Sequence, residues 1–323
     1  MAKLFLSVLI AIGVLITSSF DFKKLPDNEP KKYATEYVIV LIIDGPRFTE
    51  TFGDTTYQYI PHLGHELKKE GVLLSNFRNN GPTYTISGHS AIITGRYQRI
   101  SNAGKQLPKY PSMFQYYLKE KGVPKEDAWV ISSKGKLEVL GNTRYKKWWN
   151  VYKPATYCGL HGNGADYTSD QETFDKVTEV LSGKNPPHLM LVNLLAADSY
   201  GHSKQWDMYL KSIQKCDEYA FQLWNMIQAD ERLKDKTALI ITNDHGRHLD
   251  GHKDGYVSHG DNCEGCRHIS LLAIGPDFGK NVESKACAEQ LDISKTISEI
   301  LHFQMPTGKG RVLTELFRQT GSR

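Results

Sequence analysis

Three aspartates lie just behind three apolar runs of the sequence. Asp44 follows YVIVLII, Asp198 follows LMLVNLLAA, and Asp244 follows TALIITN. In open parallel sheets, functional sites form beyond the carboxyl ends of the strands. Capping of a strand explains one such aspartate well, but it is a weak explanation for all three. The pattern therefore predicts that the three carboxylates meet at one edge of a sheet.

Two histidines accompany these aspartates. His202 lies four residues after Asp198, so both side chains face one point if the stretch is helical. His245 directly follows Asp244. Adjacent side chains diverge along an extended backbone, so these two can bind one ion only if the chain turns here. Carboxylate oxygens and neutral imidazole nitrogens bind zinc and similar divalent ions. Further downstream the chain offers four more histidines, among which spacing alone does not choose: His248, His252, His259 and His268.

A cluster of hydroxyl side chains lies in the stretch GPTYTISGHSAIITG. Its members are Thr83, Tyr84, Thr85, Ser87 and Ser90. A hydroxyl becomes a competent nucleophile beside a base or when coordinated to a cation. The chain has no GxSxG elbow and no convincing Ser-His-Asp order, so metal activation is favoured. We expect a helix to begin here with Thr85 or Ser87 as its N-cap, and its first amide groups to favour an anion. Such a site suits phosphoryl or sulfuryl transfer at two cations.

The elements that must position these residues alternate along the chain. Five continuous apolar runs predict strands buried on both faces, over 37–43, 128–133, 189–195, 237–242 and 269–275. Four further segments predict helices, over 111–122, 169–183, 206–230 and 292–303. Together they predict an α/β fold, a three-layer α/β/α sandwich with a mostly parallel central sheet. Residues 134–168 show no clear period and are expected to form loops on the rim of the site.

The N-terminus predicts export. An apolar run over Leu4–Ile16 follows Lys3 and precedes small residues, which is typical of a signal peptide spanning 1–19. The run is shorter than the ~20 residues that cross a bilayer, so we expect no transmembrane span in the mature chain. Residues 20–36 are interpreted as a linker and 37–323 as one catalytic domain. The expected location is periplasmic or secreted.

Charge and cysteine content exclude some functions. The net charge of +4 comes without a long basic run, so no nucleic-acid-binding surface is indicated. Five cysteines are an odd count, which leaves at least one thiol free or paired between chains. Cys263 and Cys266 form a single CxxC. Without a second such pair, a local disulfide or two plain thiols are favoured over a structural metal site.

The order of motifs resembles the alkaline phosphatase superfamily, in particular its type I phosphodiesterases/nucleotide pyrophosphatases and phosphoglycerate mutase-like enzymes. The motifs are LIIDG, TYTISGHSAIITG, DSYGH, NDHG, SHGDN and LLAIGPDF, closing with DISKTISEILHFQMPTGKGRVL. Each is weak alone, but the ordered set covers most of the chain after residue 19. The resemblance implies an alkaline phosphatase-like fold and a two-metal site.

The resemblance also implies roles for individual residues. Thr85 matches the nucleophile, because the family places a Ser or Thr four residues before the His at position 89. The first metal ion would be held by Asp44, Thr85, Asp244 and His245. The second would be held by Asp198, His202 and His259, with His252 as the alternative third ligand. Zinc is the expected ion, with manganese as the alternative.

Three departures from the superfamily patterns narrow the expected reaction. Gly88 stands where phosphodiesterases place an asparagine that binds a phosphate oxygen, and the mutases have glycine there. The interval after Gly95 has no room for the cap domain of a mutase. The chain also lacks the C/S-x-P-x-R signature that sulfatases need.

The expected activity is exported two-metal hydrolysis of phosphate esters through a covalent phosphothreonine at Thr85. Substrates are small-molecule or headgroup phosphate esters, whose organic part is bound by residues 144–149 unless these are plain surface. The alternatives are a phosphodiesterase or a headgroup transferase acting on lipid or glycan. A sulfatase or a non-catalytic metal-binding protein is less favoured.

Overall fold

The fold is built around β1 (Tyr37–Ile43), a strand with the sequence YVIVLII. The computed structural model describes residues 32–318. The other strands are β2 (Gly71–Arg78), β3 (Ala128–Ser132), β4 (Ala155–Cys158), β5 (Leu189–Leu194), β6 (Thr237–Thr242), β7 (His268–Ile274), β8 (Val282–Ser284) and β9 (Ala288–Glu289). Their order in the sheet is β4-β3-β5-β1-β6-β7-β2-β8, and β9 also pairs with β2.

The sheet is mostly parallel, as predicted. The run β4-β3-β5-β1-β6 is parallel throughout. β7 is antiparallel to both of its neighbours, β6 and β2, while β8 and β9 pair with β2 in parallel. All five predicted strands form within one residue of the expected ends, but β2, β4, β8 and β9 were not predicted.

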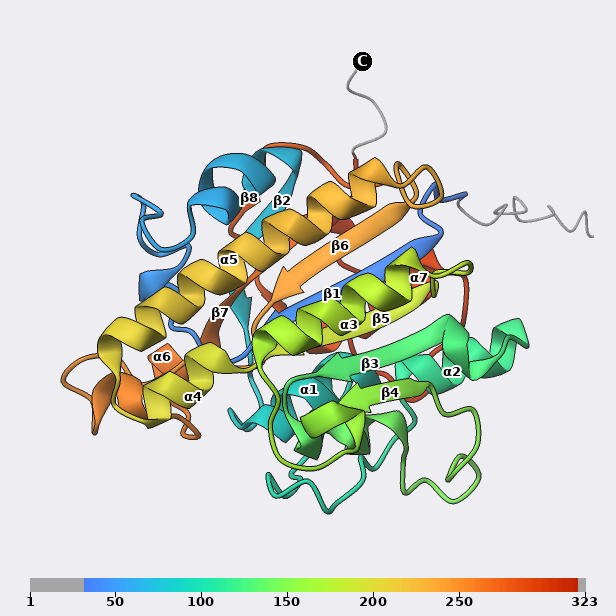
Figure 1. The fold of residues 1–323 in the computed structure, drawn as a ribbon, viewed down its shortest axis with the longest axis horizontal. Coiled ribbons are helices and arrows are strands. Elements are labelled where there is room, and N and C mark those ends of the chain that lie inside the picture. Colours follow the sequence, from blue (N-terminus) through green and yellow to red (C-terminus); the bar gives the residue numbers. More distant parts are fainter. Residues whose placement is uncertain (1–31, 319–323) are drawn as a thin grey trace, which may run out of the picture. The chain divides into compact units, whose positions relative to one another are not determined.

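Helices cover both faces of the sheet (Figure 1). They are α1 (Thr85–Thr94), α2 (Met113–Lys121), α3 (Asp170–Ser182), α4 (Ala196–His202), α5 (Trp206–Ala229), α6 (Glu264–Arg267) and α7 (Leu291–Ile300). One face packs against α1, α2 and α7, and the other packs against α3 and α5. The predicted three-layer architecture and its four long helices are therefore confirmed.

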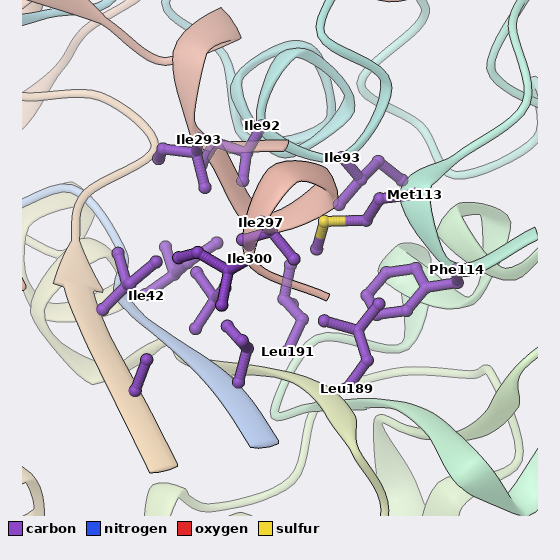
Figure 2. Close-up of a cluster of buried hydrophobic side chains, with 14 of the residues drawn as sticks. Ile42, Ile92, Ile93, Met113, Phe114, Leu189, Leu191, Ile293, Ile297 and Ile300 are labelled. Carbon is purple, nitrogen blue, oxygen red and sulfur yellow. The ribbon is translucent and has the colours of Figure 1, made fainter. Parts of the chain in front are cut away.

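The alternation of side chains along β1 explains why the run is apolar throughout. Val38, Val40 and Ile42 belong to the core below α1, α2 and α7. The intervening Ile39, Leu41 and Ile43 belong to the core below α3 and α5. Successive strand residues point to opposite faces, so a strand covered on both faces has no polar position. Figure 2 shows Ile42 among the side chains of the first core, which meets isoleucines of α1 and α7.

Residues 134–168 are more ordered than predicted. They include a 3-10 helix, η5 (Gly135–Gly141), and the edge strand β4. β4 pairs in parallel with β3, so this segment extends the sheet as well as lining its rim.

The N-terminal predictions lie largely outside the described residues. The signal peptide at 1–19 and most of the linker at 20–36 fall there. Within 32–318, no helix is long and apolar enough to cross a membrane. All five cysteines are free thiols.

Candidate active site

Three neighbouring strands bring the three predicted aspartates together. Asp44 follows β1 directly, Asp244 lies two residues beyond β6, and Asp198 lies in α4, four residues beyond β5. Because β5, β1 and β6 are parallel neighbours, their carboxyl ends share one edge of the sheet. Each aspartate is at most 5% exposed. The carboxylates therefore form a buried acidic centre.

Gly45 allows the acidic centre to pack closely. Its φ is +67°, and a Cβ at this position would lie 2.9 Å from Asp198 Oδ1 and 3.0 Å from Arg247 Nη1. Left-handed backbone and close approach both favour glycine. The Asp-Gly pair after β1 is thus a steric requirement of the site.

Thr85 is the first residue of α1, and Tyr84 occupies the N-cap position with extended backbone. The prediction that Thr85 or Ser87 caps this helix is therefore wrong. Because Thr85 lies inside the helix, its hydroxyl is not used as a cap. Lys134 Nζ lies 3.4 Å from Thr85 Oγ1. The structure thus places the predicted nucleophile next to a buried ammonium group.

His202 and His259 lie together beside Asp198. Their Nε2 atoms are 3.1 Å apart, and they lie 3.4 and 3.5 Å from Asp198 Oδ1. His259 Nδ1 donates to the carbonyl oxygen of Thr83 at 2.7 Å, which leaves its Nε2 facing the carboxylate. His252 instead contacts Asp261 at 2.9 Å. Of the two alternatives left by the sequence, His259 is the one that lies beside Asp198 and His202.

The other group of candidate ligands, which corresponds to the first predicted ion, surrounds Asp44 and Asp244. His245 Nε2 lies 3.3 Å from Asp244 Oδ2 and 3.7 Å from Asp44 Oδ1. His89, which the sequence analysis used only for spacing, also belongs here, with its Nδ1 3.3 Å from Asp244 Oδ2. Candidate donor atoms of Asp44, His89 and Asp244 lie within 4.8 Å of one another, as do those of Asp44, Asp198 and His245.

Lys134 and Arg247 are site residues that the sequence analysis missed. Lys134 Nζ lies 2.9 Å from Asp44 Oδ1 and 2.6 Å from Asp198 Oδ2. Arg247, which is fully buried, donates to Asp198 Oδ1 at 2.6 Å. A buried charge is stable only when it is paired, so these cations compensate two of the carboxylates. A basic residue just past a strand end, like the aspartates, is the signal that would have indicated Lys134.

Asp244 lacks such an ion pair with Lys134 or Arg247, and its electrostatics differ accordingly. Burial and the neighbouring Asp44 raise the pKa of Asp244 to about 6. Burial opposes the ionisation of Asp198 as well, but Lys134 and Arg247 outweigh it and hold the pKa of Asp198 well below its usual range. Two cationic side chains thus face three carboxylates, and Asp244 is the one left without a cation.

For three histidines of the site, burial favours the neutral form that metal ligands need. Burial lowers the pKa of His202 and His245, and lowers that of His259 to about 4. Four buried atoms of the group around Asp44 and Asp244 have no hydrogen-bond partner: Asp44 Oδ1, His89 Nε2, Asp244 Oδ2 and His245 Nε2. Buried polar atoms without a hydrogen bond are costly, and a divalent cation would satisfy Asp244 Oδ2 and His245 Nε2 and would add to the ion pair that Lys134 already makes with Asp44 Oδ1. The donor set therefore fits a metal ion.

Buried amides fix the backbone and carboxylates of this centre. Asn193 Nδ2 donates to Asp44 Oδ2 at 3.0 Å. Asn79 Nδ2 and Gln290 Nε2 donate to the carbonyl oxygen of Asp244 at 2.8 and 2.6 Å. Such contacts orient ligand side chains before any ion binds.

A pocket of about 330 Å³ opens onto Thr85. Its lining residues are Thr85, Asn102, Lys134, Lys136, Tyr167, Leu195, Asp198, Ser199, His202, Ser203 and His259. Residues 134–168 thus line the pocket with their two ends. The middle of that segment lies elsewhere, because Trp148 packs against Tyr116 with ring centroids 4.5 Å apart. None of residues 144–149 lines this pocket.

Comparisons with known proteins agree with the predicted fold and family. The family model for type I phosphodiesterase / nucleotide pyrophosphatase matches residues 38–249, more than half of the chain. No curated protein matches. Among solved structures, the phosphonate monoester hydrolase of Silicibacter pomeroyi aligns with TM-score 0.64 and 13% identity, covering 86% of this chain and 76% of its own.

Two further solved structures have similar folds. The alkaline phosphatase PafA aligns with TM-score 0.64 and 12% identity, covering 90% of this chain and 100% of its own. Murine ectonucleotide pyrophosphatase / phosphodiesterase 5, solved as an inactive threonine-to-alanine variant with AMP, aligns with TM-score 0.60 and 16% identity, covering 87% and 97%. The structural similarity shows the shared fold, and the matching family model shows the lineage. The protein belongs to the type I phosphodiesterase / nucleotide pyrophosphatase family of phosphoester hydrolases, within the alkaline phosphatase superfamily.

Proposed function

We propose that the protein hydrolyses phosphate esters, with monoesters preferred, by nucleophilic attack of Thr85. The observation that carries this proposal is the position of the Thr85 hydroxyl, which opens onto the pocket and lies 3.4 Å from Lys134 Nζ. Lys134 itself bridges Asp44 and Asp198, one from each candidate ligand group. Thr85 therefore lies where both groups meet.

Two sets of residues would hold divalent ions, most favourably zinc. Asp44, Asp244 and His245 would bind one ion together with Thr85, while the second set is Asp198, His202 and His259. When bound, such ions lower the pKa of a coordinated hydroxyl and offset negative charge on the phosphoryl group. Imidazole and carboxylate donors suit zinc, and a carboxylate-rich set also accepts manganese.

The reaction has two displacements at phosphorus. In the first, the bond between Thr85 Oγ and phosphorus forms while the ester bond breaks, and the leaving alcohol takes up a proton. In the second, a water oxygen bonds to phosphorus, the phosphothreonine bond breaks, and phosphate leaves with the Thr85 hydroxyl restored. Lys134 stabilises the phosphoryl oxygens in both steps, because its ammonium group is fixed before the substrate binds.

The preference for monoesters follows from the charge of the pocket. A monoester carries up to two negative charges near neutral pH, whereas a diester carries one. Two lysines line the pocket beside Thr85: Lys134, which is shared with the carboxylates of Asp44 and Asp198, and Lys136. At Gly88, the position of the asparagine in phosphodiesterases, a Cβ would lie 2.4 Å from the carbonyl oxygen of Asp244. An asparagine therefore has no space there.

The test compares an aryl phosphate monoester with the matching diester. The protein is stripped of metal with a chelator and assayed before and after zinc or manganese is added back. We expect metal-dependent turnover that is faster with the monoester and absent in Thr85→Ala, while the variant keeps its metal. Metal binding without turnover of either ester would refute the hydrolase proposal. Faster diester turnover would refute the substrate preference and favour the phosphodiesterase alternative.

Export is a separate part of the proposal. It is supported by the apolar run Leu4–Ile16 and the small residues behind it. Expression in a bacterial host should release a chain that begins near residue 20, outside the cytoplasm. Recovery of the uncleaved chain from the cytoplasm would contradict this part alone.

A further inference from the structure

A further group of potential metal-binding side chains lies outside the active-site pocket. It consists of His248, Asp261, Cys263 and Cys266, hereafter the thiol cluster. One donor atom from each of the four residues lies within 4.8 Å of the others. None of the four lines the pocket at Thr85. The cluster therefore needs an explanation that the proposed hydrolysis does not supply.

His248 is oriented as a metal ligand. Its side chain is 3% exposed, and its Nδ1 lies 2.8 Å from Asp254 Oδ1. This contact places the ring proton on Nδ1, so the lone pair is on Nε2. That Nε2 is buried without a hydrogen-bond partner and lies 3.4 Å from Asp261 Oδ2. A histidine held by a carboxylate at one nitrogen and free at the other is the usual arrangement beside zinc.

The two thiols complete a set of soft donors. Cys263 is the N-cap of α6 and Cys266 lies within that helix, with the Cys266 N–H donating to Cys263 Sγ at 3.4 Å. Both are free in the structure. Burial raises the pKa of Cys263, and raises that of Cys266 to about 12, so without a cation both remain protonated. Thiolates select zinc among common divalent ions.

Asp261 offers the fourth donor and a means of charge balance. Its Oδ1 accepts from the Cys263 N–H at 3.0 Å, while its Oδ2 faces the cluster. Lys253 Nζ and His252 Nε2 also contact Oδ2, at 2.6 and 2.9 Å. Two thiolates and one carboxylate exceed the charge of one divalent ion by one, and Lys253 supplies the compensating positive charge. Cys263 also lines a small surface pocket, together with His252.

We propose that His248, Cys263, Cys266 and Asp261 bind a structural zinc ion. A closed set of four nitrogen, sulfur and oxygen donors is typical of structural sites. The ion links the segment after β6, which carries Asp244 and His245, to the loop that carries His259. The same two segments are joined by the His248 N–H, which donates to Ser258 O at 3.0 Å. The thiol cluster thus positions ligands of the active site without contacting the substrate.

Cobalt substitution tests this site independently of hydrolysis. Reduced, metal-free protein is loaded with Co²⁺ and its near-ultraviolet spectrum is recorded. Thiolate bound to Co²⁺ gives an intense charge-transfer band, which the oxygen and nitrogen donors of the active site do not produce. We expect the band in the wild type and in Thr85→Ala. A wild type without the band overturns the proposal even if the protein is an active hydrolase.

Cysteine variants assign the band to the cluster. Cys263→Ser and Cys266→Ser should each lower the intensity of the band by at least half, since each removes one of the two thiolates, and the double variant should abolish the band and lower the zinc content of the protein by one ion per chain. Cys287→Ser is the matched control, because Cys287 is exposed and outside the cluster. This variant should keep the band and its full zinc content. Cys263 is partly exposed, so its variant remains informative if Cys266→Ser does not fold. A band of undiminished intensity in Cys263→Ser, or a Cys263–Cys266 disulfide in the intact native protein, overturns the assignment.

Discussion

The active site and the thiol cluster differ in how the chain assembles them. The carboxylates of the active site lie just beyond the ends of three strands and are far apart in sequence, whereas the thiol cluster comes entirely from residues 248–266. The first is rich in charge, contains two buried cations and opens onto a pocket of about 330 Å³. The second combines thiols with one histidine and one carboxylate. The sheet thus positions the groups proposed to react, whereas the thiol cluster is proposed to hold residues 248–266 in place.

The largest effect that separates the two sites is expected for Thr85→Ala. Removal of a nucleophile typically lowers turnover by several orders of magnitude, so kcat should fall at least ~10³-fold. The Thr85 side chain makes no contact with the thiol cluster, and Tm should change by less than about 2 °C. Steady-state kinetics and thermal unfolding measure the two quantities. Substantial residual turnover with unchanged metal content would show that another group attacks phosphorus.

A pair of histidine variants sharpens the comparison. His202→Gln removes a half-exposed candidate ligand of the active site and should lower kcat about 100-fold or more, since loss even of an outer partner costs 10–100-fold. His248→Gln removes a buried ligand of the thiol cluster and should lower Tm by roughly 5 °C, since ~2 kcal/mol is lost in a domain of this size. Kinetics should show the larger loss of kcat in His202→Gln, and calorimetry should show the larger loss of Tm in His248→Gln. Equal profiles for the two variants would mean that the sites are not functionally distinct.

Lys134→Met tests the charge of the pocket. Methionine keeps the length of the side chain but removes the ammonium group that bridges Asp44 and Asp198. A charge-assisted hydrogen bond is worth about 1.5–3 kcal/mol, so kcat/KM for the monoester should fall roughly 10–100-fold. The diester, with one charge fewer, should lose less. Lys147→Met, on the exposed middle of the rim segment, is the control. An equal loss of kcat/KM for both esters would mean that Lys134 only holds Asp44 and Asp198 in place and does not stabilise the substrate.

The sequence predicted the centre of this molecule better than its edges. β1 and β6 have the expected ends because continuous apolar runs are unambiguous for strands buried on both faces, and the aspartates behind them followed from parallel pairing. The edge strand β4 was missed because its four residues, ATYC, lie in a segment without periodicity.

The missed site residues have a common physical reason. Lys134 and Arg247 are residue types that usually lie on the surface, and their burial is explained by partners distant in sequence: Asp198 pairs with both, and Asp44 also pairs with Lys134. His259 was not separable from His252 by spacing. The carbonyl oxygen of Thr83, which orients the His259 ring, belongs to a segment more than 170 residues away.

Gly88→Ala probes the packing below the acidic centre. The added methyl group would lie 2.4 Å from Asp244 O, so α1 and the strand end must separate. Overpacking of this kind costs typically 1–3 kcal/mol, which corresponds to a decrease in Tm of a few degrees and a modest loss of kcat as Asp244 shifts. Gly308→Ala is the control, because the nearest atom to its Cβ lies at 3.4 Å. Equal Tm values for the two variants would contradict the close packing at Gly88.

The smallest effect is expected for Trp149→Ala. The sequence analysis considered residues 144–149 as a binding surface for the organic part of the substrate. However, Trp149 is 58% exposed, and only the two ends of residues 134–168 line the pocket at Thr85. An exposed side chain away from the pocket contributes little to binding, so KM and kcat should stay within about twofold of the wild type, and Tm within a degree. Kinetics with a small aryl phosphate and with a bulkier nucleotide monoester measure this directly. A severalfold rise in KM for the nucleotide alone would show that the rim segment contacts large substrates and that the site extends beyond the pocket.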